Sequence, residues 1–295
     1  MSRKRPEHQA PPEIYYDQDE ALKYTNCTRI IEIQRNLSER ALELLALPPE
    51  KSCLILDLGC GSGLSGQVLS EHGHSWIGID ISTSMLDVAS LRIKDSDSDA
   101  DDANMSDSSS TQDSRFSEDT NLLDGNLILG DFGDGVPLRA GSIDGVISIS
   151  ALQWLCNADR NAHQPWKRMQ ALFTTLFATL VPGGRAVFQF YPENSSQIEL
   201  LTNQAVRAGF TGGLVIDFPN STKAKKLFLC LFAGGRLQSL PEGLTDNIEK
   251  CKKKRKPQKK SREWILAKKE RWRRKGRDNV RPDTKYTGRR RCGKF

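Results

Sequence analysis

A short apolar segment followed by alternating glycines carries the clearest chemical signal in this sequence. Residues 55–63 read Ile-Leu-Asp-Leu-Gly-Cys-Gly-Ser-Gly, and the glycines are Gly59, Gly61 and Gly63. We predict a buried strand, a turn and then a helix over Leu64–Glu71. Glycine suits such a turn because it allows positive φ and lets a ligand lie against bare backbone. The pattern is also compatible with a tight turn that binds nothing.

A second carboxylate favours a nucleoside ligand. Residues 76–80 predict a strand that ends in Asp80, about 20 residues after the glycines, where an acid binds ribose hydroxyls. The spacing G-x-G-x-G differs from the G-x-G-x-x-G of dinucleotide folds, in which a helix N-terminus meets a pyrophosphate. Asp57 precedes these glycines and would repel a pyrophosphate. We therefore expect a cationic amino-acid ligand.

These features resemble the first motif of class I S-adenosylmethionine-dependent methyltransferases, whose ligand carries an ammonium and a sulfonium. Strand and helix patterns alternate, which predicts an α/β fold with a seven-stranded, Rossmann-like, mostly parallel sheet and helices on both faces. We expect the later strands near residues 127–132, 142–150, 185–191, 213–218 and 226–233. We expect the other helices near residues 28–46, 83–94, 164–180 and 197–208.

Open α/β sheets bind ligands at the carboxyl ends of their strands, which assigns residues to S-adenosyl-L-methionine. Asp57 and the glycine turn are expected to hold the methionine part, and Asp80 the ribose. Four residues are expected around the adenine: Ile81 and Met85 flank it, Asp131 accepts from its amino group, and Phe132 lies beside the ring. The expected cofactor-binding residues are Tyr24, Asp57, Gly59, Gly61, Gly63, Asp80, Ile81, Met85, Asp131, Phe132 and Ser148.

Charge divides the chain into an acidic body and a basic tail. From Lys250 onward, 22 Lys and Arg face 4 Asp and Glu, whereas the whole chain of 295 residues carries a net charge of +6. Residues 250–260 have the composition of a nuclear-import signal, and residues 261–276 predict a basic helix with two tryptophans. Basic residues interleaved with Trp suit nucleic acid, by phosphate neutralisation and base stacking. The alternative is a tail that only improves solubility.

We expect three regions along the chain. Residues 1–50 form an N-terminal extension, disordered to about residue 14, with Tyr24 in a lid and then a helix. Residues 51–235 form the methyltransferase domain, and residues 236–295 form a disordered or helical basic tail that binds RNA. Residues 95–124 hold ten acidic residues and almost no apolar mass, so we expect a disordered insertion. This insertion is either a phosphorylatable loop or a tolerated surface connection.

Cysteine spacing and hydropathy indicate the redox compartment and argue against a metal site, a membrane helix and a signal peptide. The 7 cysteines are scattered and form no Cys-x-x-Cys pair, which favours a reducing compartment and argues against a metal site of the chain's own. No apolar run reaches about 18 residues, so we expect no membrane helix. The first residues lack the apolar core of a signal peptide.

The segment after the fourth strand indicates the acceptor. Residues 148–157 read Ser-Ile-Ser-Ala-Leu-Gln-Trp-Leu-Cys-Asn, residues 191–194 Tyr-Pro-Glu-Asn, and residues 218–221 Phe-Pro-Asn-Ser with lysines after them. These motifs resemble the eukaryotic small-subunit ribosomal RNA (guanine-N7) methyltransferase family. The resemblance covers residues 16–235 and the basic tail, and this chain departs from it in the acidic insertion.

The resemblance implies an enzyme that methylates N7 of one guanine in 18S ribosomal RNA and helps the small ribosomal subunit mature. It implies a nuclear and nucleolar location, with the cytoplasm left open. The implied partners are small-subunit ribosomal RNA with its precursor particle and an obligate small zinc-binding activator subunit, without a membrane. We expect the strand near Leu127–Leu129 at a sheet edge, which the activator would cover.

Guanine N7 is a lone-pair acceptor, so no proton has to be removed before it attacks a methyl group. We therefore expect no general base, and we interpret the four histidines as ordinary surface residues. Gln153 and Trp154 are the candidates for holding the guanine, by an edge hydrogen bond and by stacking, and Tyr191 is a third. Trp154 is also compatible with a core position.

Two other function classes stay open from the sequence. One is a small-molecule methyltransferase of the sterol or quinone kind, which requires a closed apolar acceptor pocket. The other is a non-catalytic ribosome assembly factor that keeps the methyltransferase fold as a scaffold.

Overall fold

The structure is a computed structural model that describes residues 5–49, 51–101, 125–158, 163–221, 224–234, 239–245, 262–274, 280–284 and 287. Its strands are β1 (Leu54–Leu58), β2 (Ser75–Asp80), β3 (Gly125–Leu129), β4 (Ile143–Ile149), β5 (Leu180–Phe190), β6 (Thr211–Asp217) and β7 (Lys226–Phe232). Its α-helices are α1 (Pro12–Tyr15), α2 (Gln18–Asn26), α3 (Thr28–Leu45), α4 (Leu64–Glu71), α5 (Thr83–Asp101), α6 (Pro165–Thr179), α7 (Ser195–Arg207) and α8 (Arg262–Arg274). Its 3-10 helices are η1 (Pro6–His8), η2 (Phe132–Asp134) and η3 (Leu152–Cys156).

The strands form one seven-stranded sheet in the order β3-β2-β1-β4-β5-β7-β6. The five strands from β3 to β5 are parallel, whereas β7 runs antiparallel to both of its neighbours. The predicted mostly parallel α/β sheet is therefore confirmed. The chain moves outward from β1 to β3 and then returns to β4 on the other side of β1. This reversal opens a crevice at the carboxyl ends of β1 and β4, where such folds bind ligands.

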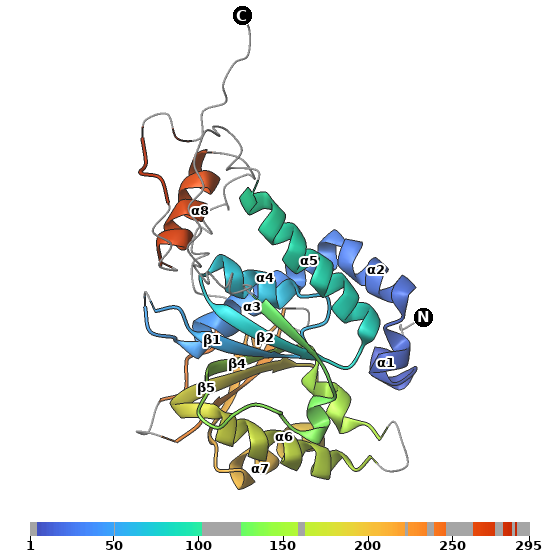
Figure 1. Ribbon diagram of the computed structural model, residues 1–295. Helices are drawn as coiled ribbons and strands as arrows, with labels where there is room; N and C mark the ends of the chain where they lie inside the picture. The colour runs from blue at the N-terminus through green and yellow to red at the C-terminus, as the bar shows by residue number, and fades with distance from the viewer. Residues whose placement is uncertain are drawn as a thin grey trace, which may run out of the picture.

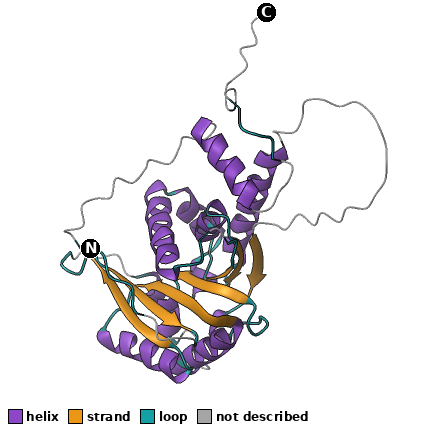
Figure 2. Cartoon of the chain, turned by 90° about the vertical axis from the view of Figure 1, so that its left-hand side faces the viewer, coloured by secondary structure: helices purple, strands orange, loops and turns teal. Residues whose placement is uncertain are grey.

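Helices cover both faces of the sheet, as Figures 1 and 2 show. On one face, Leu37 and Leu44 of α3 and Leu69 of α4 pack in a buried apolar cluster with the sheet. On the other face, α6 and α7 supply a second cluster that includes Phe173 and Leu201. Apolar residues at helical spacing thus face the sheet from both sides, and the sheet becomes a rigid platform for its loops.

Two strand boundaries differ from the sequence prediction. β5 begins at Leu180 rather than near Arg185, so it includes Pro182 and the following glycines, with an irregular register against β4. β3 ends at Leu129 rather than at Phe132. The chain turns there because the Asp131 carboxylate caps η2, accepting from the backbone N–H of Gly133 at 2.8 Å.

Two segments predicted as disordered are partly ordered. α5 continues to Asp101, seven residues beyond its predicted end, since no proline or glycine occurs in residues 83–101 to stop it. Residues 102–124 of the acidic insertion lie outside the described residues. At the N-terminus, residues 5–14 form η1 and the start of α1. Proline stands in the first turn of both helices, where its fixed φ favours helix formation.

The chain stays in contact with the sheet beyond the predicted boundary at residue 235. The Leu244 carbonyl accepts from Phe218 N–H at 2.7 Å, and Leu244 N–H donates to the Asp217 carboxylate at 2.8 Å. Arg40 of α3 pairs with the same buried carboxylate at 2.9 Å. Residues 239–245 thus follow the end of β6, and the body of the protein extends at least to Leu244.

The basic tail contains a helix where one was predicted. In α8, the Lys268 ammonium lies 5.1 Å from the ring centroids of both Trp264 and Trp272. Arg274 at its end lies in a hollow formed by the segments that precede β1 and β2. The described part of α8 therefore reaches the amino ends of the strands, opposite the crevice. Residues 250–260, the predicted import signal, lie outside the described residues. In the described ranges, no helix is long and apolar enough to cross a membrane.

Candidate active site

The glycine turn after β1 forms the floor of a pocket at the carboxyl ends of the strands. Gly59, Gly61 and Gly63 have φ of 72°, 51° and 76°, in the region that favours glycine. A Cβ added at Gly59 would lie 2.3 Å from the Ala151 Cβ, because the loop after β4 packs directly on the turn. A Cβ at Gly61 would meet nothing within 4 Å and would project into open space.

Asp80 at the end of β2 fixes this turn. One carboxylate oxygen accepts from Gly61 N–H at 2.8 Å, and the other accepts from Ser82 N–H at 2.9 Å. Burial raises the pKa of Asp80 above its ordinary value, and the backbone donors, led by Ser82, oppose that rise. Asp80 also lines the pocket. The predicted ribose acceptor is thus part of the framework of the site as well.

Asp57 lies behind the pocket wall, fully buried. The Ser65 hydroxyl donates to its Oδ2, while Oδ1 has no hydrogen-bond partner among the described residues. Burial raises the pKa of Asp57 to about 7, the Ser65 hydrogen bond opposes the rise, and the negative charge of Asp80 adds to it. A cationic group in the pocket would offset this burial, so the site fits an ammonium-bearing ligand such as S-adenosylmethionine.

The expected adenine end of the pocket contains an ion pair that the sequence did not reveal. Arg168 of α6 lies 2.6 Å from both oxygens of Asp131 and also lines the pocket. A Cβ at Gly133 would lie 2.5 Å from the Arg168 guanidinium, so a larger residue there would require Arg168 to move. Asp131 is therefore held by Arg168. This ion pair was not predicted from the sequence. No local pattern marks Arg168, since it is 37 residues away on another element.

Aromatic residues from the N-terminal segment cover the pocket. Tyr16 lies 6.0 Å from Tyr24 of α2 and 6.0 Å from Trp154 of η3, measured between ring centroids. The Ser82 hydroxyl donates to the Tyr16 carbonyl at 2.9 Å and joins this cover to the start of α5. Burial raises the pKa of both tyrosines. Tyr24 was predicted as a lid residue, whereas Tyr16 was not predicted, although the aromatic acidic stretch around it was a signal.

The pocket encloses about 840 Å³ of space between its lining atoms, open solvent at its mouth included. Eight of the predicted cofactor residues line it: Tyr24, Gly59, Gly61, Asp80, Ile81, Met85, Asp131 and Phe132. Asp57, Gly63 and Ser148 stand behind the wall. The buried Ser148 hydroxyl donates to the Leu58 carbonyl at 2.8 Å, so it joins β4 to β1. Gly63 stands at the start of α4, where an added Cβ would lie 3.3 Å from the Ala89 Cβ of α5.

The three predicted acceptor residues lie in different settings, and one of them lines the pocket. Trp154 lines the pocket. Gln153 is buried, and its amide donates to the Ser150 carbonyl at 2.7 Å and accepts from Tyr191 N–H at 3.5 Å. Both ends of the amide are therefore engaged within the protein, and Gln153 joins the turn after β4 to the end of β5. The Tyr191 hydroxyl lies 3.1 Å from the Lys226 ammonium.

Ser150 adopts a conformation that serine rarely takes. Its φ is 60°, directly after β4. Its backbone N–H donates to the Gln189 carbonyl at 2.9 Å, and its hydroxyl donates to the Gln189 side chain at 2.8 Å. Backbone strain held in this way is common at functional sites.

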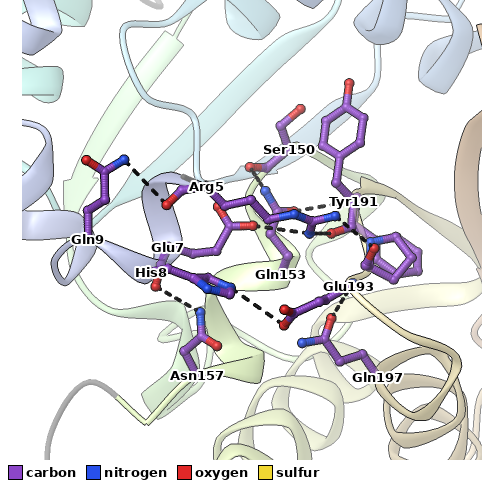
Figure 3. A network of polar contacts seen from close by, with 12 residues as sticks. Arg5, Glu7, His8, Gln9, Ser150, Gln153, Asn157, Tyr191, Glu193 and Gln197 are labelled. Atoms are coloured by element: carbon purple, nitrogen blue, oxygen red, sulfur yellow. Dashed lines mark hydrogen bonds and ion pairs between the residues drawn. The ribbon is translucent and has the colours of Figure 1, made fainter. Parts of the chain in front are cut away.

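The segment of residues 5–9 crosses the same side, as Figure 3 shows. Arg5 donates to the backbone carbonyls of Tyr191 at 2.9 Å and Pro192 at 3.3 Å. Asn157 donates to the Glu7 carbonyl at 3.2 Å, and His8 lies 3.6 Å from the Glu193 carboxylate. The N-terminal segment thus joins the loops that follow β4 and β5.

Comparison with known families matches two parts of the chain. A family profile described as "Methyltransferase involved in Williams-Beuren syndrome" matches residues 242–293, and a methyltransferase domain profile matches residues 56–188. The fold resembles a solved S-adenosylmethionine-dependent methyltransferase from Methanococcus maripaludis, with a TM-score of 0.51 at 11% identity over 76% of this chain and 96% of that one.

Curated relatives are similar along their whole length. An 18S rRNA (guanine-N(7))-methyltransferase from Mus musculus is 50% identical over 99% of this chain and 98% of its own. The Arabidopsis thaliana 18S rRNA (guanine-N(7))-methyltransferase RID2 is 47% identical over 99% of both chains. The Saccharomyces cerevisiae 18S rRNA (guanine(1575)-N(7))-methyltransferase is 43% identical over 99% of both chains.

The glycine turn gives a matched pair of variants. Gly59→Ala and Gly61→Ala both place an alanine at positive φ, at a similar backbone cost of about 1–2 kcal/mol. Gly59→Ala adds overlap with Ala151, which should destabilise the protein by roughly 1–3 kcal/mol more. Gly61→Ala should instead put its methyl group into the pocket and weaken ligand binding. Denaturant unfolding and calorimetry with S-adenosylmethionine measure the two effects. Equal loss of stability in both variants would contradict the packing described at Gly59.

Proposed function

Because the chain belongs to the 18S ribosomal RNA (guanine-N7)-methyltransferase family, we propose that the pocket described above performs that reaction with the residues named below. The protein is an S-adenosylmethionine-dependent methyltransferase that methylates N7 of a guanine in small-subunit ribosomal RNA during subunit biogenesis. The observation that carries the site assignment is the convergence of the glycine turn, Asp80 and the aromatic cover on one pocket.

The chain's own residues bind and orient rather than exchange protons. When bound, S-adenosylmethionine supplies an electrophilic methyl group: the N7 lone pair forms the new bond as the carbon–sulfur bond breaks with its electron pair remaining on sulfur. Positive charge passes to the guanine and no proton moves. Positioning two reactants at near-attack distance supplies much of such a rate.

We assign the cofactor to three parts of the pocket. Asp57, through its unpaired oxygen, attracts the ammonium, and the bare backbone at Gly61 accommodates the methionine part. Asp80 accepts from the ribose hydroxyls beside its two backbone donors. Met85 and Phe132 pack against the adenine, and Asp131, oriented by Arg168, accepts from its amino group. Trp154 stacks on the target guanine, while Gln153 and Tyr191 join the turn that carries it to the end of β5.

The tail and the location follow from charge and family. The basic tail attracts RNA phosphates that the acidic body repels, so the tail supplies affinity and the pocket supplies base choice. An enzyme that modifies small-subunit ribosomal RNA acts where that RNA is assembled, which agrees with a nuclear and nucleolar location. Both assignments stay proposals, as does the role of residues 250–260 as an import signal.

We further propose that a small zinc-binding activator subunit pairs with the free edge of β3. In the described ranges, β3 pairs with β2 alone and forms the edge of the sheet. Leu129 at its end is 58% exposed. An exposed apolar edge strand invites pairing with another chain, by backbone hydrogen bonds that extend the sheet.

The RNA assignment is tested by mapping N7-methylguanosine in 18S ribosomal RNA by chemical cleavage. Cells that lack the protein should lose one site, and the wild-type gene should restore it. Asp80→Ala should restore it poorly, because loss of a charge-assisted bond weakens cofactor binding by about 1.5–3 kcal/mol. Persistence of the site without the protein would contradict the assignment. Normal subunit maturation with Asp80→Ala would show that catalysis and scaffolding are separate, the remaining alternative for this fold.

Cofactor affinity should depend on the protonation of Asp57. The free protein holds this proton up to about pH 7, whereas the bound ammonium favours the carboxylate. Binding must therefore release the proton below pH 7, and affinity should fall by up to about tenfold per pH unit as pH decreases. Calorimetry between pH 5.5 and 8 measures this. Asp57→Asn should flatten the profile, and Asp87→Asn, an exposed acid on α5, should not.

The same proton affects stability with a defined sign. The unfolded carboxyl ionises near its ordinary pKa of 3.8, whereas the folded one ionises at about 7. The free protein should therefore lose stability as pH rises through this window, because the unfolded state binds fewer protons there. For the affinity prediction above, a cofactor affinity that does not change with pH would contradict the placement of the ammonium beside Asp57.

The activator proposal has a matched pair of surface variants. Leu129→Lys should prevent co-purification with the activator, because a charge on the edge opposes strand pairing. Val206→Lys on α7 removes a side chain of similar exposure, 61%, from a surface away from β3 and should leave the complex intact. A Leu129→Lys protein that still co-purifies, or a wild-type chain fully active alone, would contradict the proposal.

A further inference from the structure

One carboxylate on the acceptor side makes an ion pair but no hydrogen bond among the described residues. Glu7 lies in the N-terminal segment that Arg5 and Asn157 fix to the loops after β5 and β4. Its side chain is 8% exposed. Its ion-pair partner in the described ranges is Arg5, whose Nη1 lies 3.5 Å from the Glu7 Oε1. The Arg5 guanidinium donates instead to backbone carbonyls. Because the Arg5 donors are directed at these carbonyls, the Glu7 carboxylate keeps lone pairs that can accept from a ligand.

The neighbours of Glu7 place it beside the turn that follows β4. Figure 3 shows its side chain pointing toward Arg5 and the turn that carries Ser150 and Gln153. Burial raises the pKa of the Cys156 thiol to about 12, and the negative charge of Glu7 adds to the rise. Glu7 also contributes to the raised pKa of Tyr16, after burial and nearer groups. Ser150 and Trp154 of this turn line the pocket, so Glu7 lies next to the acceptor side of the pocket without being part of its lining.

Guanine offers this carboxylate a complementary edge. The ring N1–H and the 2-amino group are adjacent donors, and a carboxylate accepts from both. Adenine presents an acceptor at N1 and no 2-amino group, so it would leave the carboxylate unpaired. N7 lies on the opposite side of the purine from this edge. A guanine held by Glu7 at its donor edge therefore turns N7 away from Glu7, toward the floor of the pocket.

The charge of Glu7 also suits the product of the reaction. Methylation at N7 transfers the positive charge to the purine ring. A buried carboxylate beside that ring stabilises the charge as it develops, more strongly than it would in water.

We propose that Glu7 selects the target guanine by accepting hydrogen bonds from its N1–H and 2-amino groups, with Trp154 stacked on the base. This inference rests on the proposed function and adds to it the residue that reads the base. The N-terminal segment then belongs to the RNA-binding site rather than serving only as a cover over the cofactor.

The test changes one chemical group on the target base of the RNA and one on the protein. The full-length chain, co-expressed with the activator, is assayed on a small-subunit RNA substrate carrying guanosine or inosine at the target. Inosine keeps N7, O6 and N1–H and lacks only the 2-amino group. The wild-type enzyme should show a roughly 10- to 100-fold lower kcat/KM on inosine, as expected for loss of part of a bidentate contact.

The matched variants are Glu7→Gln and Glu32→Gln. In Glu7→Gln, the new side-chain amide would present an NH₂ group where the guanine also presents donors. This variant should therefore lower kcat/KM on guanosine roughly 10- to 100-fold and make the two substrates roughly equal. Glu32 is an exposed acid on α3, and its variant should keep the wild-type ratio. S-adenosylmethionine affinity and Tm should stay unchanged in both variants, since the Asn157 contact uses the Glu7 backbone.

Each result decides the inference. A wild-type enzyme that methylates guanosine and inosine equally would overturn it, and so would a Glu7→Gln enzyme that keeps the wild-type ratio. If Glu7→Gln does not fold, the wild-type ratio alone decides. A wild-type enzyme that binds the cofactor but methylates neither RNA would overturn the proposed function, and this inference with it. Full activity on guanosine with an unchanged preference would leave Glu7 a purely structural residue.

Discussion

The pocket depends on one carboxylate that makes several connections at once. Asp80 receives backbone N–H groups from the turn after β1 and from the start of α5, and the adjacent Ser82 hydroxyl joins both to the cover through Tyr16. A single side chain therefore sets the relative positions of two strands, one helix and the N-terminal segment. Because its lone pairs also face the pocket, ligand binding and the local fold are coupled through the same oxygens.

The cofactor half of the site was predictable because its signal is local. The glycine turn and Asp80 lie within residues 57–80. A strand–turn–helix–strand pattern places such residues at the carboxyl ends of neighbouring strands without knowledge of tertiary contacts. The other half is assembled from distant segments. Glu7, Tyr16 and Arg168 come from the N-terminus and α6, and no periodicity or spacing connects them. Tertiary contacts bring them near the pocket, such as those of Arg5 with Tyr191, Ser82 with Tyr16 and Asn157 with Glu7.

The differences from prediction have physical causes of two kinds. A strand-end pattern identifies a polar residue but not its partner, so the sequence did not indicate that Arg168 pairs with Asp131 or that Gln153 donates to the Ser150 carbonyl. Composition also misled where tertiary contacts outweigh it. Residues 5–14 are polar and rich in proline, yet Arg5 anchors them to backbone carbonyls of the loop after β5.

If α8 binds RNA as proposed above, its position gives the protein two separate contacts with its substrate. Arg274 lies at the amino ends of the strands, while the pocket opens at their carboxyl ends. The five residues of β1 alone separate the two by about 17 Å at about 3.3 Å per residue. A small RNA hairpin in the pocket occupies one contact, whereas a large particle whose surface reaches both ends occupies two. The second contact then forms at a high effective concentration, so avidity favours the assembled particle over free RNA.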